Sequence, residues 1–258
     1  MSHEKLYGIH PVREALEGQR RRIDKVLLEV RRRDPEAQRI VTLATQRGIP
    51  IETVHSAELR HLLGHSHHQG VVALVAPLVP ESFIDVLGRL EAASSRQTVV
   101  VLDGVTDVGN FAALMRSAVA FGVEALCVPR HRSVSLNPTV AKRSAGALES
   151  LSVVEVANVV RALEELKRVG FWVYGADTAA DTAVGQVAWP ERVVLVLGSE
   201  ARGLRRLVRE NCDALVRIPM RAGVDSLNVA VAGAIILAYI WGQQADVDTA
   251  AEQSRPLP

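Results

Sequence analysis

Short apolar runs alternate with amphipathic stretches through the second part of the chain. Each run holds four or five mostly apolar residues, as is typical of strands buried on both faces. The runs are Val99–Leu102, Ala125–Val128, Phe171–Tyr174, Val193–Leu197 and Ala214–Ile218. Stretches with helical periodicity separate or follow them: Asn110–Phe121, Pro138–Leu148, Val159–Val169, Arg202–Asn211 and Ser226–Trp241. This order predicts an α/β fold with a mostly parallel sheet, and its ligands are expected beyond the carboxyl ends of the strands.

The first part of the chain has the pattern of a separate, smaller α/β unit. Lys25–Val30 and Gly70–Val75 are typical of strands, and Pro35–Gly48 is typical of a helix. A proline-containing stretch with a short helical segment follows. We therefore predict four parts: a domain at 1–76, a linker at 77–96, a second domain at 97–244 and a flexible tail at 245–258.

Composition places the chain among ordinary soluble globular proteins. Of its 258 residues 48% are hydrophobic and 23% charged, which excludes a disordered or collagen-like chain. The longest apolar run, Val229–Trp241, is too short to span a bilayer, and the N-terminus lacks the apolar core of a signal peptide. Cys127 and Cys212 belong to no CxxC motif or Cys/His cluster. We expect no metal, no membrane association and a cytoplasmic protein with two buried, reduced thiols.

Charge gives only a local indication of a nucleic-acid partner. The net charge is +1, and aromatic residues make up 4% of the chain, so neither a generally basic surface nor a large stacking platform is expected. Residues 1–76, however, carry 12 Lys and Arg against 9 Asp and Glu, with seven of the eight histidines. A second basic run contains Arg130, Arg132, Lys142 and Arg143. It is either a solvated face or a phosphate-binding surface.

The common nucleotide and hydrolase motifs are absent. Neither glycine turn, at 104–109 or at 198–203, is followed by the Lys-Ser/Thr pair of a P-loop. No GxGxxG follows a strand, and the chain contains no GxSxG elbow. These absences argue against a nicotinamide dehydrogenase, a Rossmann-type methyltransferase and an α/β-hydrolase.

Three polar segments remain as candidate chemistry, and each has an ordinary structural alternative. Asn110 is predicted to cap a helix, and Arg116 lies six residues later in an apolar stretch, where it needs either a carboxylate or a substrate as partner. Glu200 follows a glycine turn and suits a helix dipole or a ligand. Ser226 is predicted to cap the last helix, where Asn228 is either a satisfied amide or a functional group.

Together these segments resemble the SpoU (TrmH-like) family of RNA ribose 2′-O-methyltransferases. The Asn-x-Gly-x-x-x-Arg motif is found at Asn110–Arg116, with Ala112 in place of the usual glycine. The Gly-x-Glu-x-x-Gly turn is found at Gly198–Gly203. The third motif is matched by Ile218–Met220 and Ser226–Ala230.

The resemblance extends to the N-terminal segment and to one branch of the family. Tyr7–Leu16 and His68–Val71 are similar to the ends of the family's L30e-like substrate-binding domain. Leu102–Asp107 and Val128–Ser133 are most similar to the branch that methylates a guanosine of 23S ribosomal RNA. The implied function is therefore methylation of a ribose 2′-hydroxyl in structured RNA.

The resemblance also implies a fold, a cofactor and a site. The fold is a SPOUT-type α/β-knot with a C-terminal trefoil knot, and the protein is a homodimer with its site near the dimer interface. The implied catalytic residues are Arg116, Asn110, Glu200, Ser226 and Asn228. The implied contacts to S-adenosylmethionine are Leu197, Gly198, Ile218, Met220, Leu227 and Thr178. The expected RNA contacts are His10, Arg13, Arg130, Arg132, Lys142 and Arg143.

The role of Arg116 has two versions. The family assigns it to activation of the hydroxyl, but the pKa of a guanidinium lies above 12, which disfavours a literal base. It would instead hold a phosphate and stabilise the developing alkoxide.

Three other functions compete with a 23S rRNA methyltransferase. The first is a 2′-O-methyltransferase of tRNA, or of rRNA in a resistance-type enzyme. The second is a non-catalytic RNA-binding ribosome assembly factor. The third is an enzyme that acts on a small nucleotide. The intact polar set favours catalysis, and the L30e-like segment has no role in a small-molecule enzyme.

Overall fold

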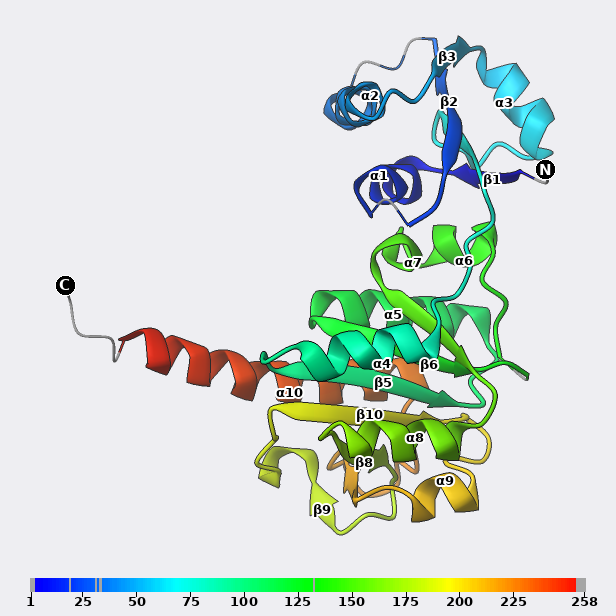
Figure 1. Cartoon of the computed structure of the whole chain (residues 1–258). Coiled ribbons are helices and arrows are strands. Elements are labelled where there is room, and N and C mark those ends of the chain that lie inside the picture. Colours follow the sequence, from blue (N-terminus) through cyan, green and yellow to red (C-terminus); the bar gives the residue numbers. More distant parts are fainter. Residues whose placement is uncertain (1–2, 19, 31, 33, 132, 254–258) are drawn as a thin grey trace. The chain divides into compact units, whose positions relative to one another are not determined.

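The chain divides into two compact units, which are described separately. The computed structural model describes residues 3–18, 20–30, 32, 34–131 and 133–253 (Figure 1). The first unit contains Met1–Val79 and Ser135–Ser150, and the second contains Pro80–Val134 and Leu151–Pro258. Residues 135–150 therefore pack with the N-terminal unit, although the sequence prediction assigned them to the domain at 97–244.

The first unit is built on a four-stranded sheet with the order β1-β4-β2-β3. Strands β2 and β3 are parallel, and β4 is antiparallel to both β1 and β2. The strands are β1 (Glu4–Tyr7), β2 (Ile23–Glu29), β3 (Ile51–Val54) and β4 (Val71–Val75). The helices are α1 (Ile9–Gly18), α2 (Pro35–Gln46), α3 (Ser56–Leu63), α6 (Pro138–Arg143) and α7 (Ala147–Ser150).

A buried ion-pair cluster holds α7 in the first unit. The guanidinium of Arg21 donates to the carboxylate of Glu149, and both side chains are almost fully buried. The same guanidinium donates to Glu4 at 3.0 Å. The predicted helix Pro138–Leu148 is interrupted after Arg143, because Ala145 and Gly146 have φ values of 52° and 93°, a conformation that ends a right-handed helix.

The second unit is built on a seven-stranded sheet with the order β7-β6-β5-β10-β8-β11-β9, in which all strand pairs are parallel. Its strands are β5 (Gln97–Asp103), β6 (Val123–Pro129), β7 (Ser152–Val156), β8 (Trp172–Ala176), β9 (Thr182–Ala183), β10 (Arg192–Gly198) and β11 (Ala214–Arg217). Its helices are α4 (Phe83–Ala92), α5 (Val108–Ala120), α8 (Val159–Arg168), α9 (Arg206–Glu210), α10 (Val229–Gln253) and the 3₁₀ turn η1 (Val184–Gln186). The predicted α/β fold with a mostly parallel sheet is confirmed.

Helices cover both faces of this sheet. One core joins alternate residues of the central strands, such as Val99 and Val194, to α4 and α8. On the other face α5 and α10 pack together. Gly233 of α10 lies so close to Leu114 and Leu197 that an added Cβ would come within 2.5 and 2.8 Å of their side chains. A larger residue would push α10 off the sheet.

Helix α10 continues to Gln253, although a flexible tail was predicted to begin at residue 245; residues 254–258 lie outside the described residues. Among the described residues, no helix, α10 included, combines the length and apolar content that a membrane crossing requires.

Candidate active site

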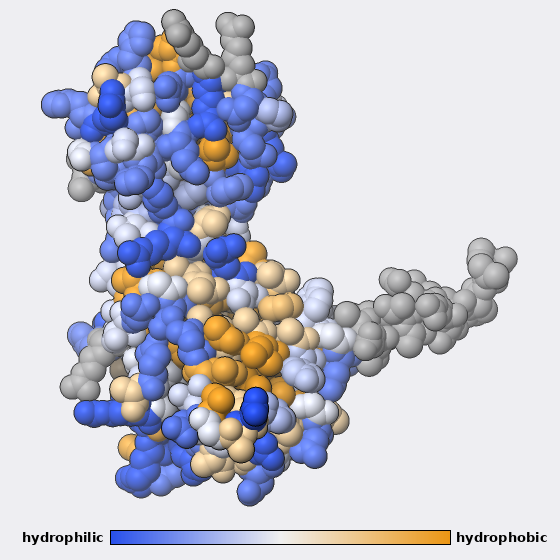
Figure 2. All heavy atoms as spheres, turned by 180° about the vertical axis from the view of Figure 1, so that it is seen from behind, coloured by the Kyte–Doolittle hydropathy of each residue, from blue (hydrophilic) through white to orange (hydrophobic). Residues whose placement is uncertain are grey.

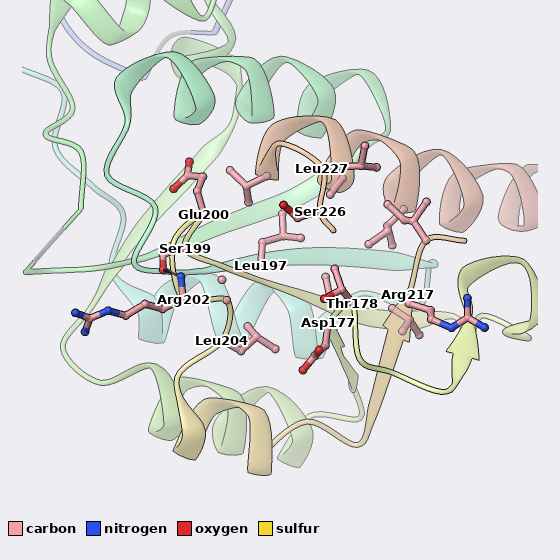
Figure 3. A pocket seen from close by; sticks show the side chains of 18 of the residues that line it. Asp177, Thr178, Leu197, Ser199, Glu200, Arg202, Leu204, Arg217, Ser226 and Leu227 are labelled. Atoms are coloured by element: carbon pink, nitrogen blue, oxygen red, sulfur yellow. Dashed lines mark hydrogen bonds between the residues drawn. The ribbon is translucent and has the colours of Figure 1, made fainter. Parts of the chain in front are cut away.

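A cavity of about 490 Å³ opens at the carboxyl ends of β8, β10 and β11 and reaches the beginning of α10. Leu197, Ser226 and Leu227 surround this space, and Glu200 lies at its edge (Figure 3). The location agrees with the expectation that parallel α/β sheets bind ligands beyond their strand ends. The volume falls within the range of small-molecule and cofactor sites.

A tight turn after β10 forms one wall of the cavity. Ser199 and Gly203 exchange two backbone hydrogen bonds of 3.1 and 2.8 Å, so the turn presents Glu200 at its tip. The backbone of Gly203 passes so close to Gly198 that a Cβ on Gly198 would lie 2.1 Å from the Gly203 carbonyl carbon. Only glycine fits at position 198, and the bare backbone there is open to a bound molecule.

The structure brings all six predicted cofactor residues to this cavity: Leu197, Gly198, Ile218, Met220, Leu227 and Thr178. Apolar side chains and exposed backbone groups predominate among them. Such a surface fits the adenine and methionine parts of S-adenosylmethionine, which need apolar contact and backbone hydrogen bonds. The residues present therefore fit the cofactor, and the individual contacts stay predictions.

Asp177 adds a negative charge to the cavity wall. Burial raises the pKa of its carboxyl group, but hydrogen bonds from Arg209 and from the backbone of Ala179 outweigh burial, and the pKa is lowered overall. The Arg209 guanidinium donates at 2.7 Å. Asp177 is therefore an anion at neutral pH, suited to an ammonium or hydroxyl group.

A chain of hydrogen bonds joins three predicted catalytic residues from three distant segments. Asn110 Nδ2 donates to Glu200 Oε1 at 2.5 Å. Asn228 Nδ2 donates to Asn110 Oδ1 at 2.8 Å. Asn228 Oδ1 in turn accepts from the backbone amides of Ala230 and Val231. The amide groups are thus aligned from the N-terminus of α10 towards the Glu200 carboxylate.

The predicted N-caps of α5 and α10, Asn110 and Ser226, are wrong. Asp107, not Asn110, caps α5, and its carboxylate accepts from the Asn110 backbone at 2.7 Å. Asn228, not Ser226, caps α10. The shift leaves the Asn110 amide free to join Glu200 to Asn228, while Ser226 lines the cavity.

Arg116 is placed differently from the other predicted catalytic residues. Its side chain is exposed on α5, and it does not line the cavity. Within the described residues the guanidinium has no hydrogen bond or ion pair, so of the two partners considered for it, a carboxylate and a substrate, the carboxylate is not found in the single chain. Six residues of helix separate it from Asn110, about 240° of net rotation. An exposed, unpaired guanidinium remains available to an RNA phosphate.

The predicted RNA contacts differ in how free their charges are. His10, Arg130 and Arg143 are exposed, whereas Arg132 lies outside the described residues. Arg13 is held by Glu14 and Glu36 at 3.0 and 2.8 Å, so a phosphate would have to compete with both carboxylates. These assignments stay predictions.

Lys142 is also engaged within the first unit. Its ammonium donates to the carbonyl oxygen of His67 at 2.5 Å and lies 4.4 Å from the centre of the Tyr7 ring. Burial lowers its pKa.

An ion pair that the sequence reading missed supports the turn from behind. Asp103, at the end of β5, is fully buried and accepts from Arg205 Nε at 2.6 Å and from the Arg205 backbone at 2.8 Å. The sequence feature that indicates such a pair is an aspartate at the end of an otherwise apolar strand, where a buried charge without a partner would be costly. The pair ties β5 to the segment that follows Gly203.

The two cysteines are unpaired, and they differ in burial. Cys127 is buried and Cys212 partly buried, so the expectation of two buried thiols is met fully only at Cys127. Burial raises the pKa of both thiols to about 12. Across the described residues, no three or more His, Cys, Asp or Glu side chains come together as a possible metal site.

Two family descriptions match the chain. Residues 97–238 match the SpoU rRNA methylase family, and residues 5–80 match the RNA 2′-O ribose methyltransferase substrate-binding family.

Relatives that match nearly the whole chain carry a specific name. The chain is 39% identical to a 23S rRNA (guanosine-2′-O-)-methyltransferase RlmB of Xanthomonas axonopodis pv. citri, over 90% of this chain and 93% of the relative. It is also 39% identical to the protein of that name from Pseudomonas aeruginosa, over 95% and 98%.

Solved structures show a similar fold. The SpoU methyltransferase AviRb of Streptomyces viridochromogenes, in complex with AdoMet, aligns with a TM-score of 0.75 and 26% identity, over 94% of this chain and 91% of that one. A TrmH/SpoU tRNA-modifying enzyme of A. aeolicus aligns with a TM-score of 0.55 and 26% identity, over 67% of this chain and 90% of that one.

Proposed function

The chain belongs to the SpoU rRNA methylase family, and on that premise we propose that it methylates the ribose 2′-hydroxyl of a guanosine in 23S ribosomal RNA. As a member of the family it is an S-adenosylmethionine-dependent RNA 2′-O-methyltransferase. The observation that carries the assignment to this site is the Asn228–Asn110–Glu200 chain of hydrogen bonds beside the cavity.

The polar chain would orient the reacting hydroxyl. When bound, S-adenosylmethionine supplies an already activated methyl group on a sulfonium. The protein must then align the 2′-oxygen and ease the loss of its proton. Asn110 occupies one oxygen of Glu200, and the other oxygen is left to accept a hydrogen bond from the hydroxyl. The amides fix the carboxylate in place, so little reorganisation is needed in the transition state.

Arg116 would act on the RNA rather than on the carboxylate. Because its guanidinium is exposed and has no partner among the described residues, it is available to bind the phosphate next to the target ribose. Bound there, its positive charge would stabilise the developing alkoxide. This supports the clamp over a literal base.

Coverage favours ribosomal RNA over tRNA. The 23S rRNA relatives match 90% or more of the chain and so include the first unit. The tRNA-modifying structure aligns over 67% of this chain. The first unit would dock the RNA, in agreement with the predicted domain at 1–76, and an rRNA substrate would place the protein in the cytoplasm.

Methyl transfer to each RNA tests the substrate. The protein is incubated with radiolabelled S-adenosylmethionine and either a 23S rRNA transcript or total tRNA. We expect label in 23S rRNA only. Label in tRNA alone would support the tRNA alternative, and label in neither would support a non-catalytic assembly factor.

The exposed apolar surface supports the predicted homodimer. Apolar residues gather on one face of the second unit (Figure 2). Large exposed apolar side chains on α5 and α10 include Val119, Val231, Tyr239 and Trp241, each 41–47% exposed. Surfaces of this kind commonly mark a protein interface. Light scattering should give twice the chain mass of 28.0 kDa, and the V119E/Y239E variant should be a monomer.

The C-terminal trefoil knot stays a prediction.

A further inference from the structure

A second recess opens at the carboxyl edge of the parallel sheet, beyond the ends of β6 and β7. It encloses about 660 Å³ between the end of β6, the β7–α8 connection and the beginning of α9. Helices α8 and α9 lie side by side there (Figure 1). None of the residues that line it is Asp, Glu or Gly. It therefore differs from the cofactor cavity, whose walls include a carboxylate and a glycine turn.

The floor of the recess is apolar. Val159 and Val208 are 3% and 1% exposed, whereas Leu207 is 55% exposed. A single exposed leucine on a convex surface needs no explanation. Here it lines a concavity together with the apolar residues Val159 and Val208, so a flat apolar group placed against them would release water from both surfaces.

Arg206 and His131 line the same recess, and within the part of the chain that the structure describes neither has a strong internal partner. Arg206 is 77% exposed and its one hydrogen-bonded partner among those residues is Glu210, four residues further along the helix, and a surface pair of this kind contributes little. His131 is exposed, and its ring has no bonded partner within the described residues. Arg205 is different, since the buried Asp103 holds it in the wall.

The recess is adjacent to the cofactor cavity along the chain. Arg202 lines the cavity and Arg205 lines the recess. Three residues can span at most about 11 Å, so the two spaces are close enough for consecutive parts of one strand. The exposed Arg130 directly precedes His131, and its backbone bonds to Val156 where β7 ends.

We propose that this recess binds an unstacked nucleotide of the RNA next to the target ribose, with its base against Leu207 and its phosphate at Arg206 and His131. Apolar and cationic groups together match a base and its phosphate, and RNA is read largely through unstacked bases. The proposal rests on the proposed RNA methyltransferase function and adds a substrate subsite to it.

Kinetics of the R206A/L207S variant test the proposal. Its matched control is R168A/I84S, because Arg168 is a 68% exposed helical arginine paired with Glu165, and Ile84 is 78% exposed on α4. We expect R206A/L207S to raise the KM for a 23S rRNA transcript about tenfold, because it removes both an apolar contact and a phosphate-binding charge. The Kd for S-adenosylmethionine and the kcat at saturating RNA should stay within about twofold of wild type. The single R206A change should reduce the salt slope of RNA binding by about one.

Protection from a thiol reagent tests contact directly. Burial raises the pKa of both native thiols to about 12, so we expect them to react slowly and a cysteine introduced by Leu207→Cys to be labelled selectively with a maleimide. Saturating transcript should slow this labelling about tenfold and leave labelling of the Ile84→Cys control unchanged.

Distinct results separate the subsite from the function. Three results would overturn the subsite while the wild-type enzyme still methylates RNA. They are a KM of R206A/L207S equal to that of R168A/I84S, a fall in the kcat of R206A/L207S with no change in its KM, and equal labelling of Leu207→Cys with and without RNA. If the wild-type enzyme transfers no methyl group to any RNA, the proposed function fails and the subsite fails with it.

Discussion

Asn228 has two separable tasks, and two substitutions distinguish them. Its Oδ1 caps α10 by accepting from Ala230 and Val231 at 3.0 and 3.3 Å, and its Nδ2 donates to Asn110 at 2.8 Å. Asn228→Ala removes both interactions. Asn228→Asp keeps a good cap at a helix N-terminus, but the new carboxylate has no hydrogen to donate.

The magnitudes follow from those bonds. Loss of the cap in Asn228→Ala should cost about 1 kcal/mol of stability, a fall of about 2–4 °C in Tm for a unit of this size. Asn228→Asp should unfold within about 1 °C of wild type. In that variant the new carboxylate faces Asn110 Oδ1 with no hydrogen between the two oxygens, and turning the Asn110 amide round to donate to the new carboxylate would remove its hydrogen bond to Glu200. The bond to Glu200 that is weakened contributes about 1.5–3 kcal/mol, so kcat should fall roughly tenfold to hundredfold.

The assay combines thermal unfolding with methyl transfer at saturating RNA and cofactor. We expect both variants to be impaired in kcat and only the alanine variant to be impaired in stability. A wild-type kcat for Asn228→Asp would refute the orienting role of the amide chain. Equal destabilisation of the two variants would refute the assignment of the cap.

Further predictions follow from the same structure. Gly198→Ala should abolish S-adenosylmethionine binding measured by calorimetry, because its Cβ would lie 2.1 Å from Gly203; binding at wild-type affinity would show that the turn yields. Arg116→Ala should abolish methyl transfer and leave cofactor binding within about twofold, and transfer at near wild-type rate would remove Arg116 from the mechanism. Asp103→Ala should destabilise the second unit by about 2 kcal/mol in urea unfolding, a figure reduced because Arg205 is 60% exposed; an unchanged midpoint would deny the pair a structural role. With thiol pKa values of about 12, about one thiol in ten thousand is ionised at pH 8. Iodoacetamide should therefore alkylate the native protein at least about a hundredfold more slowly than free cysteine, and the rate should increase as the pH rises. Fast alkylation at pH 8 would contradict the burial of the thiols.

Much of the second unit could be predicted because its strands are nearly continuous apolar runs. The five predicted runs correspond to β5, β6, β8, β10 and β11. Strand β7 was missed because Ser152 and Glu155 interrupt its apolar residues, as an edge strand permits. The two-residue β9 has no pattern to detect.

Tertiary contacts decided what the sequence pattern left open. The pattern could not show that residues 135–150 pack with the first unit, since the Arg21–Glu149 contact joins residues far apart in the chain. The resemblance to the SpoU family did imply residues that line the cavity, and they lie at or just beyond the ends of β8, β10 and β11 or directly before α10. The residue pattern misplaced the helix caps, since Asp107 and Asn110 are both good caps by residue type and only the actual start of α5 distinguishes them.

The position of the transferred methyl group directly distinguishes methylation of a ribose 2′-hydroxyl from methylation of a base. After incubation of 23S rRNA with labelled S-adenosylmethionine, the RNA is hydrolysed with alkali, which cleaves only next to a free 2′-hydroxyl. We expect label in an alkali-resistant dinucleotide that contains guanosine, and none with the Arg116→Ala variant. Label recovered in ordinary mononucleotides would place the methyl group on a base and contradict ribose methylation.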